Sequence, residues 1–290
     1  MKLRLLILSV ALSLPVIVVA QSLDTAKLDE AMGRSGQQTG DVYRLGFPRT
    51  DLHVSVGGVE IKPGLALGSW AAFAGNDNAA MVMGDLVLLE SELTPVMKKL
   101  RAAGFDITAV HNHVLNETPR VIYMHYMGHG KAVELAKALH AALAESKTPL
   151  DKPAPPATSA EPPAFVKTIE DTLDTKGRFA GGVLSFGIPR REAITDHGMT
   201  LTTPQGVAEA INFQEAGAGK VATTGDFVLT AEEVNSVITA LEEHEIAVTA
   251  LHSHMLTEQP RLFFMHFWAV GSPESVAAGI KAALSHVAVK

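Results

Sequence analysis

The chain has 290 residues, of which 47% are hydrophobic and 19% are charged, so it can form a globular protein with a sizeable core. Its formal net charge of −7 argues against a nucleic-acid partner, because such proteins normally carry a basic footprint. The sequence has no cysteine, which excludes disulfides, thiolate catalysis and cysteine-ligated zinc.

The N-terminus has the pattern of an export signal. Lys2 and Arg4 precede an apolar run over residues 5–20, which ends in small residues before Gln21. This order is typical of a signal peptide that is cleaved after residue 20, with an uncleaved anchor as the less favoured alternative. The run is short for a spanning helix, so we expect no membrane span once it is removed. The sequence therefore predicts a periplasmic or secreted protein.

The rest of the chain is a tandem repeat. Residues 110–125 and 251–266 both contain His-x-His, a glutamate, Pro-Arg and Met-His, and each element of the second copy follows the first by 141 positions. The same offset relates Pro48-Arg49 to Pro189-Arg190. We therefore expect two units of one fold, over residues 24–146 and 165–290. The Pro- and Ala-rich segment 147–164 between them is predicted to be an extended, passive linker.

Each unit has the same predicted order of elements. A short helix is followed by several strands, a second helix with an apolar stripe, the two strands of the histidine motif and an Ala-rich amphipathic helix. In the second unit Thr230 and Glu233 form a capping-box pattern at the start of the second helix. This order predicts an α+β fold, with an antiparallel sheet in each unit and helices packed on one face of it.

The histidine motif predicts a metal site. Residues i and i+2 of a strand share one face, so His111 and His113 should project together, as should His252 and His254. If the following strand folds back, His125 or His266 joins the same face. Three converging imidazoles suit zinc, copper, iron or nickel, and we predict one such site in each unit, with zinc as the first choice and copper as the second. The alternatives are a hydrogen-bonded structural cluster and a metal-free catalytic site.

Four charged residues flank the predicted histidine sites. Glu117 and Glu258 lie in the connecting loops, where each is predicted to be a fourth ligand or a general base acting on metal-bound water. Arg120 and Arg261 follow the prolines, and they are predicted either to bind an anionic ligand or to pair with these glutamates.

Two aspartates also belong to the repeat. Asp85 and Asp226 follow glycines in equivalent Gly-Asp pairs. We predict that these pairs form turns, with support to a ligating histidine as the alternative role of the carboxylates.

The second unit also resembles a known family. The segments GDFVLTAEEVN, ALHSHML and PRLFFMHFWA, within residues 225–269, are similar to the LppY/LpqO-like family of exported proteins, a domain of unknown function. The resemblance covers essentially the whole mature chain and implies export and a common fold, but no reaction. Some members are lipoproteins, whereas this chain lacks the cysteine that lipidation requires.

Three functions fit these observations. The first is an exported protein that binds a transition metal or a small ligand through the duplicated histidine site. The second is a metal-dependent hydrolase in which glutamate acts as general base. The third is an envelope structural or interaction protein with architectural histidines. The sequence has no nucleophile elbow and no phosphate loop, so binding of a metal or small-molecule ligand is the preferred prediction, with no nucleic acid as partner and no membrane span after signal removal.

Overall fold

The computed structural model describes residues 22–151 and 161–290. The predicted signal peptide lies outside the described residues, as do residues 152–160 of the predicted linker. Within the described part of the chain, no helix combines the length and the apolar character needed to cross a membrane.

The first unit forms one six-stranded antiparallel sheet, with strand order β1-β2-β5-β6-β9-β7, and a small sheet of β4, β3 and β8. Its elements are α1 (Thr25–Met32), β1 (Gln37–Thr39), β2 (Val42–Pro48), β3 (Val54–Val56), β4 (Val59–Ile61), α2 (Pro63–Ala66), β5 (Gly68–Asn76), β6 (Ala79–Leu89), α3 (Glu90–Ala102), β7 (Asp106–His111), β8 (Glu117–Thr118), β9 (Val121–Gly130) and α4 (Ala132–Leu143).

The second unit repeats this topology, with strand order β10-β11-β14-β15-β17-β16 in its six-stranded sheet. Its elements are α5 (Ala164–Leu173), β10 (Arg178–Ala180), β11 (Val183–Pro189), β12 (Ile194–Asp196), β13 (Met199–Leu201), the 3-10 turn η1 (Thr203–Gln205), β14 (Ala208–Gly217), β15 (Lys220–Leu229), α6 (Ala231–Glu243), β16 (Ala247–His252), β17 (Phe263–Gly271) and α7 (Pro273–Leu284).

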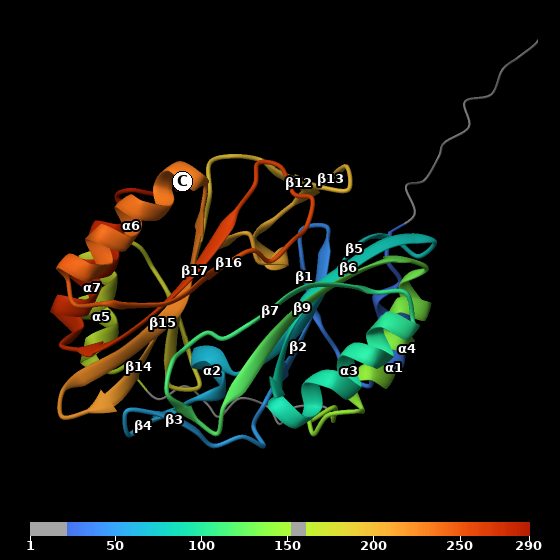
Figure 1. Cartoon of the computed structure of the whole chain (residues 1–290), viewed down its shortest axis with the longest axis horizontal. Helices are drawn as coiled ribbons and strands as arrows, with labels where there is room; N and C mark the ends of the chain where they lie inside the picture. The colour runs from blue at the N-terminus through green and yellow to red at the C-terminus, as the bar shows by residue number, and fades with distance from the viewer. Residues whose placement is uncertain (1–21, 152–160) are drawn as a thin grey trace, which may run out of the picture.

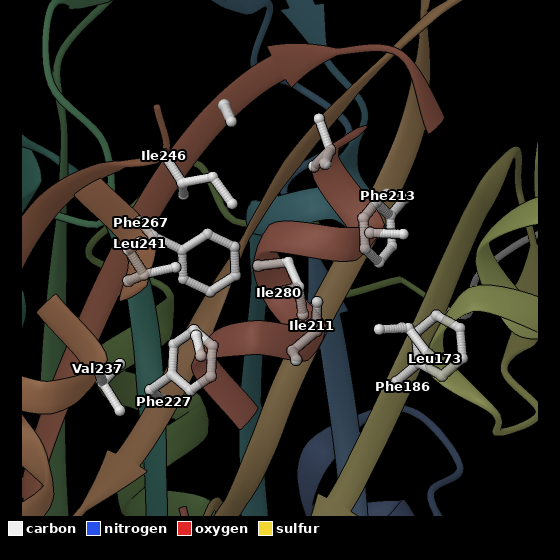
Figure 2. Packing of buried hydrophobic residues seen from close by; sticks show 14 of the residues in the cluster. Leu173, Phe186, Ile211, Phe213, Phe227, Val237, Leu241, Ile246, Phe267 and Ile280 are labelled. Carbon is white, nitrogen blue, oxygen red and sulfur yellow. The ribbon is translucent and has the colours of Figure 1, made fainter. Parts of the chain in front are cut away.

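Helices α1, α3 and α4 of the first unit and α5, α6 and α7 of the second each cover one face of their sheet, and the two helical layers lie on opposite outer sides of the molecule (Figure 1). In the second unit α5, α6 and α7 bury an apolar core that includes Phe213, Phe227, Phe267 and Ile280 (Figure 2). The predicted capping box starts α6, where the backbone N–H of Thr230 donates to the Glu233 carboxylate at 2.8 Å. The predicted α+β fold with duplicated antiparallel sheets is thus confirmed.

The other faces of the two sheets pack together into shared cores. One cluster joins Met81, Met83 and Met127 of the first unit to residues of the second such as Val228 and Phe264.

The short helix α2 of the first unit packs on β14 and β15 of the second, where Asn212 Nδ2 donates to the Leu65 carbonyl at 3.1 Å. The units therefore form one body, and residues that line their junction are held by both.

The two sheets meet along their edge strands. β7 and β16 are the terminal strands of their sheets, and they lie beside each other at the centre of the molecule (Figure 1). Each has a register shift before its histidine motif, between Ile107 and Ala109 and between Val248 and Ala250. At the second shift, the Thr249 carbonyl accepts a hydrogen bond from Asn112 Nδ2 at 3.1 Å, and its hydroxyl donates to the His113 carbonyl. This contact joins the two histidine motifs.

We expect Gly225→Ala to lower the free energy of unfolding by about 1–3 kcal/mol, because an added methyl group overpacks the sheet. A Cβ at Gly225 on β15 would collide with the Ala210 carbonyl of the neighbouring strand β14. Urea denaturation measures the loss. The matched control is Gly187→Ala in the same sheet, whose Cβ would meet only Thr203 Cγ2 at 3.8 Å. Equal stabilities for the two variants would contradict the expectation.

Candidate metal centre

The histidine motif forms a hairpin in both units, as predicted. β7 pairs with β9, and β16 pairs with β17, both antiparallel. Met124 and Met265 point into the cores under the helices, so the next residues, His125 and His266, face the opposite side.

One detail of the strand prediction is wrong. β7 ends at His111 and β16 ends at His252, so His113 and His254 lie in the loops beyond the strands. The loops nevertheless keep each pair together, with ring centroids 5.2 Å apart for His111 and His113 and 4.9 Å apart for His252 and His254.

The structure brings the two predicted triads together in one cluster, instead of keeping one in each unit. The ring centroids of His111 and His252 are 3.7 Å apart. The other close pairs also join the units: His113 to His266 at 3.8 Å, and His125 to His254 at 3.7 Å. The cause is the contact of the two edge strands, which presents both hairpins to the same space. We call these six residues the histidine cluster.

All six imidazoles have a buried nitrogen without a hydrogen-bond partner among the described residues. In each ring this atom is Nε2. Buried polar atoms in folded proteins nearly always have a partner, and an unpartnered one is costly. Six such atoms in one cluster are therefore the donor set that a cation would satisfy.

Among the described residues there are two sets of side chains that could each hold a metal ion, and within each set all ligand atoms lie within 4.8 Å of one another. One set is His111, His252, His254 and His266, which draws on both units. The other is Asp85, His111 and His125. Four imidazole nitrogens are a complete ligand set for a tetrahedral zinc site.

Burial keeps the cluster neutral. It lowers the pKa of His111 to about 3, with a further contribution from His252, and it lowers the pKa of His252 to about 4. For the other four rings burial lowers the pKa well below the usual value, and neighbouring histidines lower it further. Neutral imidazoles retain the nitrogen lone pair that metal coordination requires.

The prediction that the Gly-Asp pairs form turns is wrong. Asp85 lies inside β6 and Asp226 inside β15, and the sheet register places them opposite His125 and His266 respectively. Asp226 Oδ1 lies 3.0 Å from His266 Nδ1, which also faces the Gly225 carbonyl at 2.8 Å. The Gly225 carbonyl therefore orients this ring from behind, as outer partners of ligating histidines do, whereas Asp226 Oδ1 forms no hydrogen bond within the described residues.

Asp85 has a different position from its counterpart. Its two oxygens each lie 3.7 Å from an inward-facing nitrogen, Oδ2 from His113 Nε2 and Oδ1 from His125 Nε2. Burial raises the pKa of Asp85 to about 7, against the opposing effect of Arg44. Asp85 thus belongs to the donor side of the histidine cluster.

Aromatic rings hold the two loop histidines in place. Tyr123 stacks on His113 with ring centroids 3.3 Å apart, and its equivalent Phe264 stacks on His254 at 3.6 Å. The Tyr123 hydroxyl donates to the Ala66 carbonyl at 3.0 Å, which fixes this ring in turn. The rotamers of the loop histidines are therefore set by packing.

The glutamates and arginines of the motif lie outside both candidate ligand sets, and Glu258 pairs with Arg261. Buried Glu258 accepts hydrogen bonds from the Leu262 backbone at 3.0 Å and from Arg261 at 3.2 Å. Arg120 is exposed and lies 3.8 Å from Glu90. Glu117 is half-buried on β8, opposite Val56. Neither glutamate belongs to a set of ligand atoms in the described residues.

A cleft of about 400 Å³ between the units reaches one side of the histidine cluster. Asp85, Asp226 and His113 line it. Arg44 is also in its lining, with its guanidinium stacked on Trp70 at 4.1 Å and a hydrogen bond of 2.8 Å to the Pro204 carbonyl. The cleft therefore borders the histidine cluster on the side of Asp85 and His113.

A family model described as Domain of Unknown Function (DUF1259) matches residues 26–145 and again residues 167–286. The chain belongs to this family. It carries the DUF1259 domain twice, and each copy contains one histidine motif. No curated protein matches this two-domain DUF1259 chain.

The solved structures that are similar to the chain share little sequence with it. A trimeric bacterial microcompartment shell protein, PduB, is 10% identical over 87% of this chain and 89% of its own, with a TM-score of 0.21. EtuB from Clostridium kluyveri is 11% identical over 86% and 90%, with a TM-score of 0.19. TP0453 is 11% identical over 90% and 98%, also with a TM-score of 0.19. These values support no conclusion about the DUF1259 chain.

Proposed function

We propose that this protein binds a transition-metal ion at the histidine cluster, with His111, His252, His254 and His266 as the ligands. The observation that supports the proposal is the set of six buried Nε2 atoms that have no partner within residues 22–151 and 161–290. A structural hydrogen-bonded cluster would instead pair these nitrogens with donors or acceptors.

Zinc is the ion we propose first, and copper second. The four-histidine set contains only imidazole nitrogens, which zinc accepts in tetrahedral geometry and copper also accepts. Hard ions such as magnesium and calcium prefer oxygen ligands and are not expected in this set.

We propose binding in preference to hydrolysis. A hydrolase that used Glu258 as general base would need this carboxylate free to face a metal-bound water. Glu258 instead accepts hydrogen bonds from Arg261 and from the Leu262 backbone. A general-base role for Glu117 in metal-dependent hydrolysis stays a separate proposal. Loss of hydrolysis of ester, phosphate or amide substrates in Glu117→Gln would test it.

We expect Zn²⁺ to raise the thermal unfolding midpoint of the metal-free protein. Binding to the folded state alone adds about 2.7 kcal/mol of stability when free metal is 100-fold above Kd. Differential scanning calorimetry, run after chelator treatment and again after Zn²⁺ addition, measures the shift, with Mg²⁺ as the control ion. An equal shift with both ions, or none with either, would refute the proposed site.

We further propose that the protein acts outside the cytoplasm, as a member of the LppY/LpqO-like group of exported proteins. The support is the charged, then apolar, then small-residue order of residues 1–20. Mass spectrometry of the protein recovered from the periplasm or medium should give a chain that begins at Gln21. Recovery of a full-length chain from the cytoplasm would contradict export.

A further inference from the structure

We propose that the histidine cluster holds a second divalent transition-metal ion beside the first, with Asp85 and His125 as ligands and His113 as the third. This inference rests on the proposed function, and it assigns to Asp85 a role as ligand. Two imidazoles and one carboxylate are a donor set that divalent iron and zinc accept.

The number of donors exceeds what one tetrahedral ion can use. After His111, His252, His254 and His266 have bound the first ion, the Nε2 atoms of His113 and His125 still lack a partner among the described residues. The same is true of Asp85 Oδ1. A single ion would therefore leave three buried polar atoms unsatisfied, which is costly.

His111 cannot serve both ions. Its Nδ1 faces the Asn112 carbonyl at 3.2 Å, so only Nε2 points into the cluster. His111 belongs to both candidate sets, and one nitrogen lone pair binds one ion. His254 and His266 occur only in the first set, whereas Asp85 and His125 occur only in the second. If His111 binds the first ion, Asp85 and His125 are left for a second position, and His113 takes the third place because its Nε2 lies 3.7 Å from Asp85 Oδ2.

The geometry around Asp85 fits a bound cation better than a hydrogen bond. Its separations of 3.7 Å from His113 Nε2 and from His125 Nε2 are too long for hydrogen bonds. Ligand atoms that each lie about 2.0–2.2 Å from one zinc ion are typically separated by a little over 3 Å, so each of these two imidazoles needs only a small shift toward Asp85. Asp85 is only 5% exposed. The nearby cation, Arg44, donates instead to the Pro204 carbonyl.

The second position faces the cleft, and the first does not. Asp85 and His113 line the cleft of about 400 Å³, whereas the four histidines of the first set are absent from its lining. Three protein ligands with one side open to solvent are typical of metal ions that bind water or an exchangeable ligand. The second ion therefore has room for a small molecule that enters through the cleft.

Metal stoichiometry tests the second position. The full mature chain, purified without a His tag and freed of metal, is dialysed against Co²⁺, and bound cobalt is measured by elemental analysis. We expect about two ions per chain in the wild type and about one in Asp85→Asn, because four histidines complete the first set without Asp85. The visible absorption of tetrahedral Co²⁺ should persist in Asp85→Asn, which shows that this variant is folded and that its first ion is in place.

The matched control is Asp196→Asn. Asp196 is buried and lies outside both candidate sets. Its Oδ1 accepts a hydrogen bond from Thr257 at 2.6 Å, and its Oδ2 has no partner in the described part of the chain. This variant should keep both ions. One ion in the wild type, or two in Asp85→Asn, would overturn the second position and leave the proposed function intact. No bound ion in the wild type would overturn both.

Discussion

We expect His254→Ala to weaken the tightest Zn²⁺ binding by more than about 100-fold, because loss of an outer partner of a ligand alone costs 10–100-fold and a direct ligand contributes more. His254 is 5% exposed, and its ligand nitrogen lies within 4.8 Å of the ligand atoms of His111, His252 and His266. Competition with a metallochromic chelator measures the affinity.

The same loss is expected for His111→Ala, although His111 belongs to the other unit. Both residues are proposed ligands of one ion, so either change opens its coordination shell. Two independent sites, one in each unit, would behave differently, because each variant would keep one site at full affinity. The pair of variants therefore separates a shared centre from duplicated centres.

The control for both variants is His286→Ala, which removes an exposed imidazole outside the cluster. Its affinity should equal that of the wild type. An affinity within about threefold of the wild type in His254→Ala would mean that this imidazole is not a ligand, since loss of even an outer partner exceeds that change.

The second large effect is expected on the stability of the fold, at a buried arginine of the second unit. Arg190→Met should lower the free energy of unfolding by about 3–5 kcal/mol, because removal of the guanidinium leaves buried carboxylates without their partner. The Arg190 guanidinium is 1% exposed and donates to Glu233 at 3.0 Å, to Glu192 at 3.1 Å and to the Val228 carbonyl. Its repeat equivalent Arg49 makes the same contacts with Glu92, Asp51 and Val87.

Urea denaturation of the metal-free protein measures this effect. The control is Arg191→Met, which removes the exposed neighbouring guanidinium and its single hydrogen bond to the Val289 carbonyl. The control should cost no more than about 1 kcal/mol. Equal losses in the two variants would show that the buried ion network contributes no more than a surface contact.

The elements of each unit were predictable from the sequence because their signals are local. The stripe and capping pattern of α6 and the Ala-rich repeats of α4 and α7 determine helices without reference to the rest of the chain. Because the second unit repeats the pattern of the first, each predicted element is supported by two segments of the sequence. The hairpin that brings His125 back beside His111 was predictable for the same reason, because Pro-Arg separates two runs of strand-forming residues.

The shared centre was not predictable, because it depends on how the two sheets meet. No residue pattern within β7 or β16 predicts that these edge strands face each other. A duplicated histidine motif is equally compatible with two separate sites. The position of Asp85 depends on the register between β6 and β9, which pairs it with His125. The Gly-Asp pair alone is typical of a turn, but in each unit it lies inside a long strand whose pairing with its neighbours keeps the backbone extended.

Anomalous diffraction from crystals of the zinc-loaded protein locates each ion and its ligands, so it distinguishes a shared metal centre from separate ones. We predict a zinc ion at the junction of the units, bound by Nε2 of His252, His254 and His266 together with His111 of the other unit. Zinc ions that each bind histidines of one unit alone, or no zinc within the cluster, would contradict it.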